Sequence, residues 1–183
     1  MSQLHQSVRD GEQDEPIVIR SEEKKDWAAI HALNTAAFRS PAEADLVDAL
    51  RRQAHPVISL LAEDSQTVVG HIMFSPVVLP GYPELRIMGL APMAVLPQHQ
   101  RRGIGSALVR AGLAECRKLG FGAVVVLGHP DYYPRFGFSP ASRFGISCEY
   151  EAPEEAFMLV ELEPGYLRIA SGKVKYHASF SDL

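Results

Sequence analysis

The stretch QRRGIGSAL, residues 100–108, gathers residue types that can bind an anion. It follows an apolar run that ends at Leu96, and it precedes a proline-free segment rich in Ala, Leu, Arg and Glu. A helix that begins near Gly103 would direct several unpaired backbone N–H groups and a partial positive charge at this turn. Gly103 and Gly105 have no Cβ, so a bulky anionic group could approach the main chain closely.

Charged and hydroxyl side chains flank the two glycines. Arg101 and Arg102 add full positive charges, and Ser106 adds a hydroxyl group, so the turn is predicted to hold a pyrophosphate. Two other phosphate-binding motifs do not match, because Leu108 stands where the dinucleotide fingerprint needs a third glycine and the Gly-Lys-Ser/Thr of a P-loop is absent. The alternative is a purely structural strand-to-helix turn with solvated arginines.

The elements that position this turn follow from hydrophobic periodicity and from turn residues. The first part of the chain is expected to form a strand at 16–20, a helix at 21–38 with Ser21 as N-cap, and a helix that starts at Pro41. Strands at 57–64 and 67–79, joined by Ser65 and Gln66, should follow, and then a strand at 86–97 and a helix at 103–119 closed by Gly120. The last part should form a strand at 121–128, a further helix, a strand at 156–163 and a last segment at 172–180. This order predicts an α+β fold with a mixed, mostly antiparallel central sheet flanked by helices.

Length and composition fit one folded domain. Residues 16–183 are expected to form it, whereas residues 1–15 carry few large aliphatic side chains and a cluster of acids and are predicted to be a flexible tail. The net charge of −4 argues against a nucleic-acid-binding surface. Cys116 and Cys148 form no CxxC pair, which argues against a disulfide framework and a zinc site. The chain shows neither a signal peptide nor a membrane span, so a cytoplasmic location is expected.

Two motifs resemble those of a known family. LAPMAVLPQHQRRGIGSALVRAG, residues 90–112, is similar to the cofactor-binding motif of the GNAT superfamily of acetyl-CoA-dependent N-acetyltransferases, whose Gln/Arg-x-x-Gly-x-Gly/Ala signature is matched by Gln100, Gly103 and Gly105. YYPRFGF, residues 132–138, resembles that family's second motif. The element order from residue 16 to about residue 163 is also that of the family. VLGHPDYYPRFGF and GKVKYHASF further resemble a subgroup of predicted acetyltransferases with unassigned substrates.

The resemblance implies a cosubstrate, acetyl-CoA, and no metal. It implies that Met93, Ala94 and Val95 offer backbone groups to the pantetheine arm. It also implies that the pyrophosphate is held mainly by backbone amides of six residues, which are Arg101, Arg102, Gly103, Ile104, Gly105 and Ser106. The acceptor would be the amine of a small molecule or of a peptide. Homodimerisation is common in the family, and the C-terminal strands are the candidate interface.

In this family an amine attacks the thioester directly, so the enzyme needs a base, an oxyanion-stabilising group and an acid for the leaving thiolate. Tyr133 matches the family's general-acid position, and a phenol with a pKa of about 10 is protonated at neutral pH. Pro134 disfavours the α region for the residue before it, which makes Tyr132 an alternative acid. Packing of Tyr133 against Phe136 and Phe138 is the structural alternative.

The base is open at this point. The strand at 86–96 carries no carboxylate, and His129 could accept a proton directly or through water. A solvated loop position is the other interpretation of His129, and Glu43 and His71 are further candidates. A cysteine nucleophile lacks a paired histidine, so buried structural thiols are expected instead.

Two rival functions remain. A CoA-binding sensor would keep the pyrophosphate turn and lack efficient chemistry. A nucleotide-binding module would use the same glycine turn for ATP, but the sequence near the turn offers no Asp or Thr suited to a metal. The acetyltransferase interpretation accounts for both motifs together.

Overall fold

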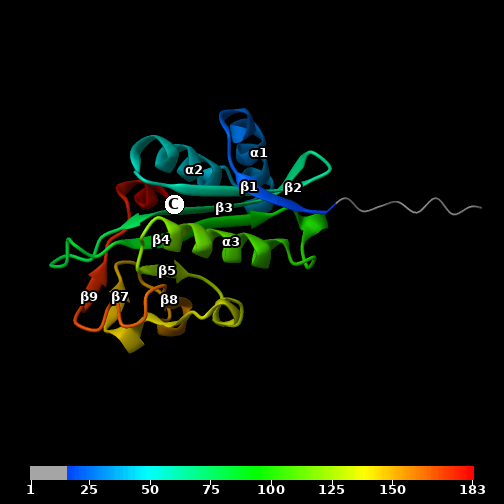
Figure 1. Ribbon diagram of the computed structural model, residues 1–183. Coiled ribbons are helices and arrows are strands. Elements are labelled where there is room, and N and C mark those ends of the chain that lie inside the picture. Colours follow the sequence, from blue (N-terminus) through cyan, green and yellow to red (C-terminus); the bar gives the residue numbers. More distant parts are fainter. Residues whose placement is uncertain (1–15) are drawn as a thin grey trace, which may run out of the picture.

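Seven strands form one sheet in the order β1-β2-β3-β4-β5-β8-β6 (Figure 1). The structure is a computed structural model that describes residues 16–183, so the predicted tail lies outside the described residues. The strands are β1 Val18–Ser21, β2 Ile58–Asp64, β3 Thr67–Val77, β4 Ile87–Val95, β5 Ala123–Leu127, β6 Ser139–Pro140 and β8 Phe157–Glu161. Only the β4–β5 pair is parallel in this sheet. The predicted α+β class and mostly antiparallel sheet are therefore confirmed.

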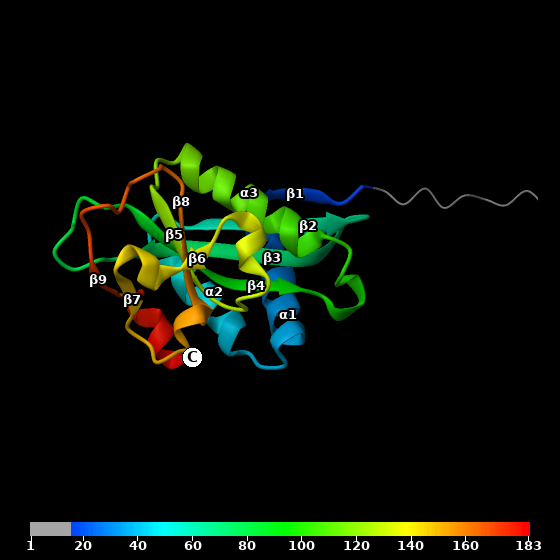
Figure 2. The same cartoon turned by 90° about the horizontal axis from the view of Figure 1, so that it is seen from below.

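A second, two-stranded sheet lies at one end of the molecule. It pairs β7 Ile146–Cys148 in parallel with β9 Gly172–Val174. An isolated bridge between Val78 and Lys175 links this end of the chain to the residue that follows β3. Figures 1 and 2 both place β7 and β9 side by side, beyond the end of the main sheet.

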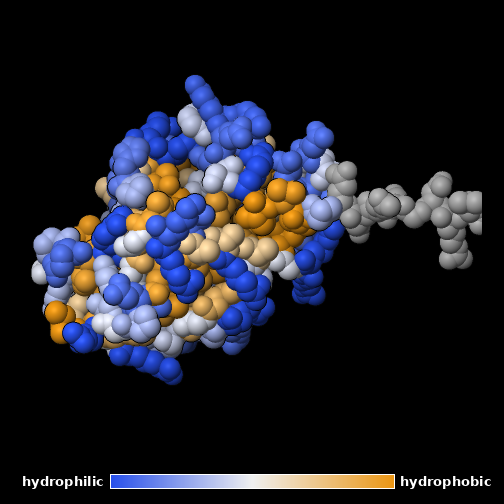
Figure 3. Space-filling view, in the orientation of Figure 1, coloured by the Kyte–Doolittle hydropathy of each residue, from blue (hydrophilic) through white to orange (hydrophobic). Residues whose placement is uncertain are grey.

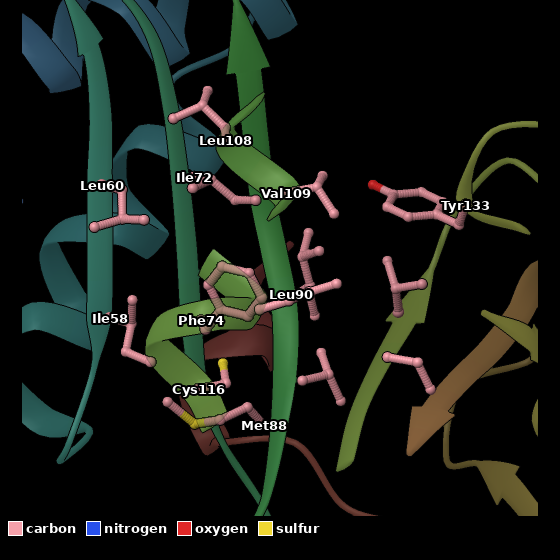
Figure 4. Packing of buried hydrophobic residues seen from close by; sticks show 14 of the residues in the cluster. Ile58, Leu60, Ile72, Phe74, Met88, Leu90, Leu108, Val109, Cys116 and Tyr133 are labelled. Carbon is pink, nitrogen blue, oxygen red and sulfur yellow. The ribbon is translucent and has the colours of Figure 1, made fainter. Parts of the chain in front are cut away.

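Helices cover both faces of the main sheet. α1 Trp27–Phe38 and α2 Ala42–Gln53 lie on one face, and α3 Ile104–Lys118 lies on the other (Figure 1). Successive residues of β3 point to opposite faces, so Met73 packs under α1 and α2 while Phe74 packs under α3. Figure 4 shows the second of these layers, where side chains of α3 meet those of β2, β3 and β4. In Figure 3 hydrophilic residues cover most of the outer side of α1 and α2.

Several predicted boundaries shift for local reasons. The first helix does not begin at Ser21. It begins with a 3₁₀ turn at Lys24–Asp26, where Glu23 and Asp26 cap each other reciprocally. The predicted hairpin turn is confirmed, because Ser65 and Gln66 join β2 and β3 with φ angles of 48° and 66°.

The sheet opens between β4 and β5. Along β4 the register with β3 advances from Leu90 opposite Phe74 to Met93 opposite Ile72, so β4 carries one extra residue there. Pairing of β4 with β5 stops at Leu90 and Val126, although β4 continues to Val95. The backbone of residues 91–95 therefore has no β-ladder partner on its β5 side within the described chain.

The segment after β5 differs from the prediction. We expect an α-helix there, and the structure has a 3₁₀ turn at Tyr133–Phe136. Pro134 has no N–H group to donate, and Gly137 ends the turn with a φ of 93°. Too few residues lie between these two positions for an α-helix. Within residues 16–183, no helix combines the length and the apolar character that a membrane crossing requires.

Candidate active site

A cavity of about 900 Å³ lies where β4 and β5 separate. Its lining residues come from both faces of the sheet. The start of α3 contributes Gly103 to Ser106, and the α1–α2 region contributes Phe38, Glu43 and Leu46. The ends of β4 and β5 form the walls between them. A molecule bound here can therefore reach from one face of the sheet to the other.

The predicted anion turn forms one end of this cavity. Gly103 is the N-cap of α3 with a φ of 80°, and Arg101 has a φ of 62°. Gln100 fixes the turn to β4, because its Nε2 donates to the backbone oxygen of Val95 at 3.1 Å. The first N–H groups of α3 have no partner within the helix, so they are free to bind an anion.

Tyr132 lies over this turn. Its hydroxyl is 3.4 Å from Ser106 Oγ, and a Cβ added to Gly105 would lie 3.0 Å from the same hydroxyl. Arg135 stacks on the Tyr132 ring at 4.5 Å and donates to its backbone oxygen. The motif residue beside Tyr133 is thus placed at the anion turn. Arg135 also lines the cavity, although no motif in the sequence predicts a role for it there.

The two predicted arginines differ in position. Arg101 lines the cavity, whereas Arg102 lies outside the cavity lining, where its guanidinium is 3.4 Å from Asp64 Oδ2. His99 also lines the cavity, and its Nε2 is 3.8 Å from Asp64. Arg102 thus holds the turn against the β2–β3 hairpin, while Arg101, His99 and Arg135 provide basic side chains at the cavity.

The β4 residues alternate as a strand requires. Met93 and Val95 line the cavity, and the Ala94 side chain is buried toward the opposite side. The backbone of all three belongs to the segment that has left β5. Such a free edge can pair with an extended, amide-containing ligand as a strand would.

Tyr133 is both a packed side chain and a cavity residue. Only 7% of it is exposed, its ring lies against Gly128, and it meets Phe138 edge to face at 5.6 Å. Its hydroxyl points toward the β4 side (Figure 4), and the residue lines the cavity. Burial raises the pKa of Tyr133 to about 12, so the phenol is protonated at neutral pH.

The three candidate bases lie in different surroundings. His129 is exposed and lines the cavity, and its backbone oxygen accepts the Tyr132 N–H at 3.1 Å. Glu43 lines the cavity from α2. His71 is fully buried, is bonded to Asn34 and is outside the cavity lining. Geometry therefore leaves His129 and Glu43 as groups that could reach a substrate.

Neither cysteine lines the cavity. Cys116 is buried in α3, and burial raises its pKa to about 12. Cys148 is half-buried in β7, and burial raises its pKa as well. Across residues 16–183, no three His, Cys, Asp or Glu side chains gather as metal ligands would.

Comparison with known proteins gives one consistent family. The model of the acetyltransferase (GNAT) family matches residues 27–138. The uncharacterized N-acetyltransferase YhbS of Escherichia coli K12 is 37% identical over 166 residues, which cover 90% of this chain and 99% of the relative. The crystal structure of Escherichia coli YhbS in complex with CoA matches with a TM-score of 0.86 and 35% identity, over 96% of each chain.

A second solved structure contains acetyl-CoA. The GNAT family acetyltransferase of Brucella melitensis, in complex with acetyl-CoA, matches with a TM-score of 0.74 and 38% identity, over 90% of this chain and 98% of the other. The family match includes both the turn before α3 and the segment that carries Tyr132 and Tyr133.

Proposed function

This chain belongs to the acetyltransferase (GNAT) family and is an acetyl-CoA-dependent acyltransferase, and from that premise we propose that it acetylates a primary amine by direct attack on the thioester. The observation that carries the proposal is the cavity at the β4–β5 opening. An anion-binding turn, a free strand edge and a buried phenol all line it. The acceptor is the amine of a small molecule or of a peptide.

The cavity fits the cosubstrate by its chemistry. Free N–H groups at the start of α3, with Arg101 beside them, suit a diphosphate. On its β5 side the backbone of residues 91–95 has no β-ladder partner in the described chain, and only the Val95 oxygen there is taken, by Gln100. This edge suits the amides of a pantetheine arm, in the way that a strand edge accepts an extended peptide. Gly105 keeps the space beneath the Tyr132 hydroxyl open. Both CoA-bound relatives support this assignment.

Acetyl-CoA, when bound, supplies an acetyl group activated as a thioester. We assign Tyr133 the role of general acid, because its raised pKa keeps a proton available for the departing thiolate at neutral pH. Backbone N–H groups on the free edge of β4 are suited to stabilise the negative charge that develops on the carbonyl oxygen. A C–N bond forms and the C–S bond breaks.

The amine must lose a proton before it attacks. We assign this task to His129, acting directly or through water, because the side chain is exposed at the cavity and close in sequence to Tyr133. The proton balance is then closed. His129 takes one proton from the ammonium and passes it to solvent. The thiolate receives a proton from Tyr133, and the second proton that the nitrogen loses as the amide forms restores the Tyr133 phenol, directly or through water.

Release of CoA thiol with a panel of amines tests this function. We expect Tyr133→Phe to lower kcat by about 100-fold with little change in the KM for acetyl-CoA, because general acid catalysis contributes about that much. Tyr132→Phe is the matched control. Since its hydroxyl faces Ser106, we expect it to raise the KM for acetyl-CoA more than it lowers kcat.

The same measurement distinguishes an acetyltransferase from the rival function, a CoA-binding sensor. A CoA-binding sensor would gain thermal stability from acetyl-CoA and release no thiol with any amine. Unchanged kcat in Tyr133→Phe would remove Tyr133 from the mechanism. In His129→Gln, unchanged kcat/KM for the amine would assign proton removal to another group.

A further inference from the structure

The end of the cavity opposite the diphosphate turn carries a feature that the proposed mechanism does not use. Glu43 lies in the first turn of α2, and its side chain lines the cavity. Its Oε2 is buried and has no hydrogen-bond partner among residues 16–183. A buried carboxylate oxygen without a partner is costly, so a site of this kind favours a ligand that brings a donor or a positive charge.

Charges are segregated along the cavity. His99 and Arg101 precede α3, and Arg135 stacks on Tyr132 above the same turn, so the basic side chains gather at the diphosphate end. Glu43 comes from the opposite face of the sheet and is the only Asp or Glu side chain among the residues of the cavity lining. An anion is therefore attracted to one end and a cation to the other.

Apolar side chains line the cavity together with Glu43. Phe38, the last residue of α1, and Leu46, one helical turn after Glu43, line the same region. Leu127 contributes a further apolar side chain from the end of β5. Phe38 and Leu127 are 38% and 42% exposed, so both have apolar surface that a ligand could cover.

From these three observations we propose that Glu43 determines the acceptor class, by pairing with the ammonium of a primary amine that carries an apolar group and no carboxylate. The inference rests on the proposed acetyltransferase function and narrows its acceptor. An α-amino acid would place a second carboxylate near Glu43, and the repulsion of like charges would exclude it. Proton removal stays with His129.

Steady-state acetyl transfer to a matched pair of amines tests the proposal. 2-Phenylethylamine carries the apolar group alone, and phenylalanine adds the carboxylate to the same skeleton. We expect the native enzyme to have a higher kcat/KM for 2-phenylethylamine than for phenylalanine. We expect Glu43→Gln, which keeps the shape and removes the charge, to lower kcat/KM for 2-phenylethylamine by at least about tenfold, because one partner of a partly buried charge pair is lost. The KM for acetyl-CoA should not change.

The change in preference is the decisive readout. Glu43→Gln should also reduce the ratio of kcat/KM for 2-phenylethylamine to kcat/KM for phenylalanine. A loss of folded enzyme alone would lower both values and leave their ratio unchanged. Asp45→Asn is the matched control, since Asp45 lies in the same helical turn, is exposed and does not line the cavity. It should behave as the native enzyme.

The results distinguish a failure of the proposed role of Glu43 from a failure of the proposed acetyltransferase function. If the native enzyme binds acetyl-CoA and acetylates no amine, the proposed function fails and the inference fails with it. If amines are acetylated but Glu43→Gln matches Asp45→Asn, or if phenylalanine is the better acceptor, the proposed function stands and the role of Glu43 is overturned.

Discussion

The anion turn depends on two glycines that are needed for different reasons. Gly105 is needed for space, because an added Cβ would lie 3.0 Å from the Tyr132 hydroxyl. Gly103 is needed for conformation, because its φ is 80° while an added Cβ would have no neighbour within 4 Å. We therefore expect Gly105→Val to weaken acetyl-CoA binding by at least about tenfold, with the fold retained.

Isothermal titration calorimetry with acetyl-CoA provides the measurement for this prediction, and Gly103→Ala is the control. That variant should lose about 1 kcal/mol of stability through backbone strain and keep most of its affinity. If Gly105→Val binds acetyl-CoA as the native protein does, the turn does not hold the diphosphate.

At the residue scale, motif positions were easier to predict than side-chain directions. The spacing of Gln100, Gly103 and Gly105 locates the turn, because the geometry there is a property of the local backbone. The sequence could not show that Arg102 turns away to Asp64, since that contact depends on how the β2–β3 hairpin packs beside the turn. The position of the Tyr132 hydroxyl over Ser106 depends on tertiary packing in the same way.

At the element scale, hydrophobic periodicity predicted the strands and long helices well. It could not predict the separation of β4 from β5, because each strand is regular by itself and only their pairing shows where contact ends. The extra residue in β4 near Ala91 is invisible for the same reason. The helix expected after β5 was a wrong prediction of a different kind, because Pro134 and Gly137 are local residues that limit this segment to a 3₁₀ turn.

The close packing of α3 against β3 gives a prediction at the element scale. Gly112 faces β3, and an added Cβ would overlap the ring of Phe74. A Gly→Ala change inside a helix normally stabilises by about 1 kcal/mol through propensity, whereas overpacking a core costs about 1–3 kcal/mol. We expect the packing cost to win, so Gly112→Ala should lower the melting temperature.

Thermal unfolding of two variants separates these effects. Ala114→Gly, at an exposed position of the same helix, measures the propensity effect without packing. A higher melting temperature for Gly112→Ala would mean that α3 can move away from Phe74 at little cost, and the close contact would then not limit stability.

At the scale of the whole molecule, a buried polar network ties α1, α2, β2 and β3 to the residue that follows β1. Arg51 of α2 donates to Glu22, which follows β1, at 2.6 Å. Ser59 of β2 donates to Glu22 and lies 2.9 Å from His71 Nε2, in β3. Asn34 of α1 lies 3.2 Å from His71 Nδ1. The network anchors α1 and α2, and with them the Glu43 side of the cavity, to the sheet.

Opposing effects set the protonation states in this network. Burial raises the pKa of Glu22, but hydrogen bonds from Arg51 and Ser59 outweigh it and lower the pKa below its ordinary value. Burial lowers the pKa of His71 from 6.5 to about 4. Glu22 is thus charged and His71 neutral at pH 7.

The neutral state of His71 predicts a specific dependence of stability on pH. Between pH 6.5 and about 4 the unfolded chain binds a proton at this histidine and the native chain does not. Stability is therefore full above pH 6.5 and falls as the pH decreases toward about 4. We expect His71 alone to contribute a loss of roughly 2 kcal/mol between about pH 7 and about pH 5. Asp26, whose pKa is lowered to about 2 mainly by its hydrogen bond with Arg20, acts only at lower pH.

Urea unfolding at several pH values tests this assignment through the slope of the unfolding free energy. His71→Asn should flatten the slope between about pH 7 and about pH 5, whatever its effect on absolute stability. His129→Asn is the control, because His129 is exposed and outside the network. If both variants keep the native slope, the acid sensitivity arises elsewhere. If only His71→Asn flattens it, the residue suggested by sequence as a catalytic base acts instead in folding.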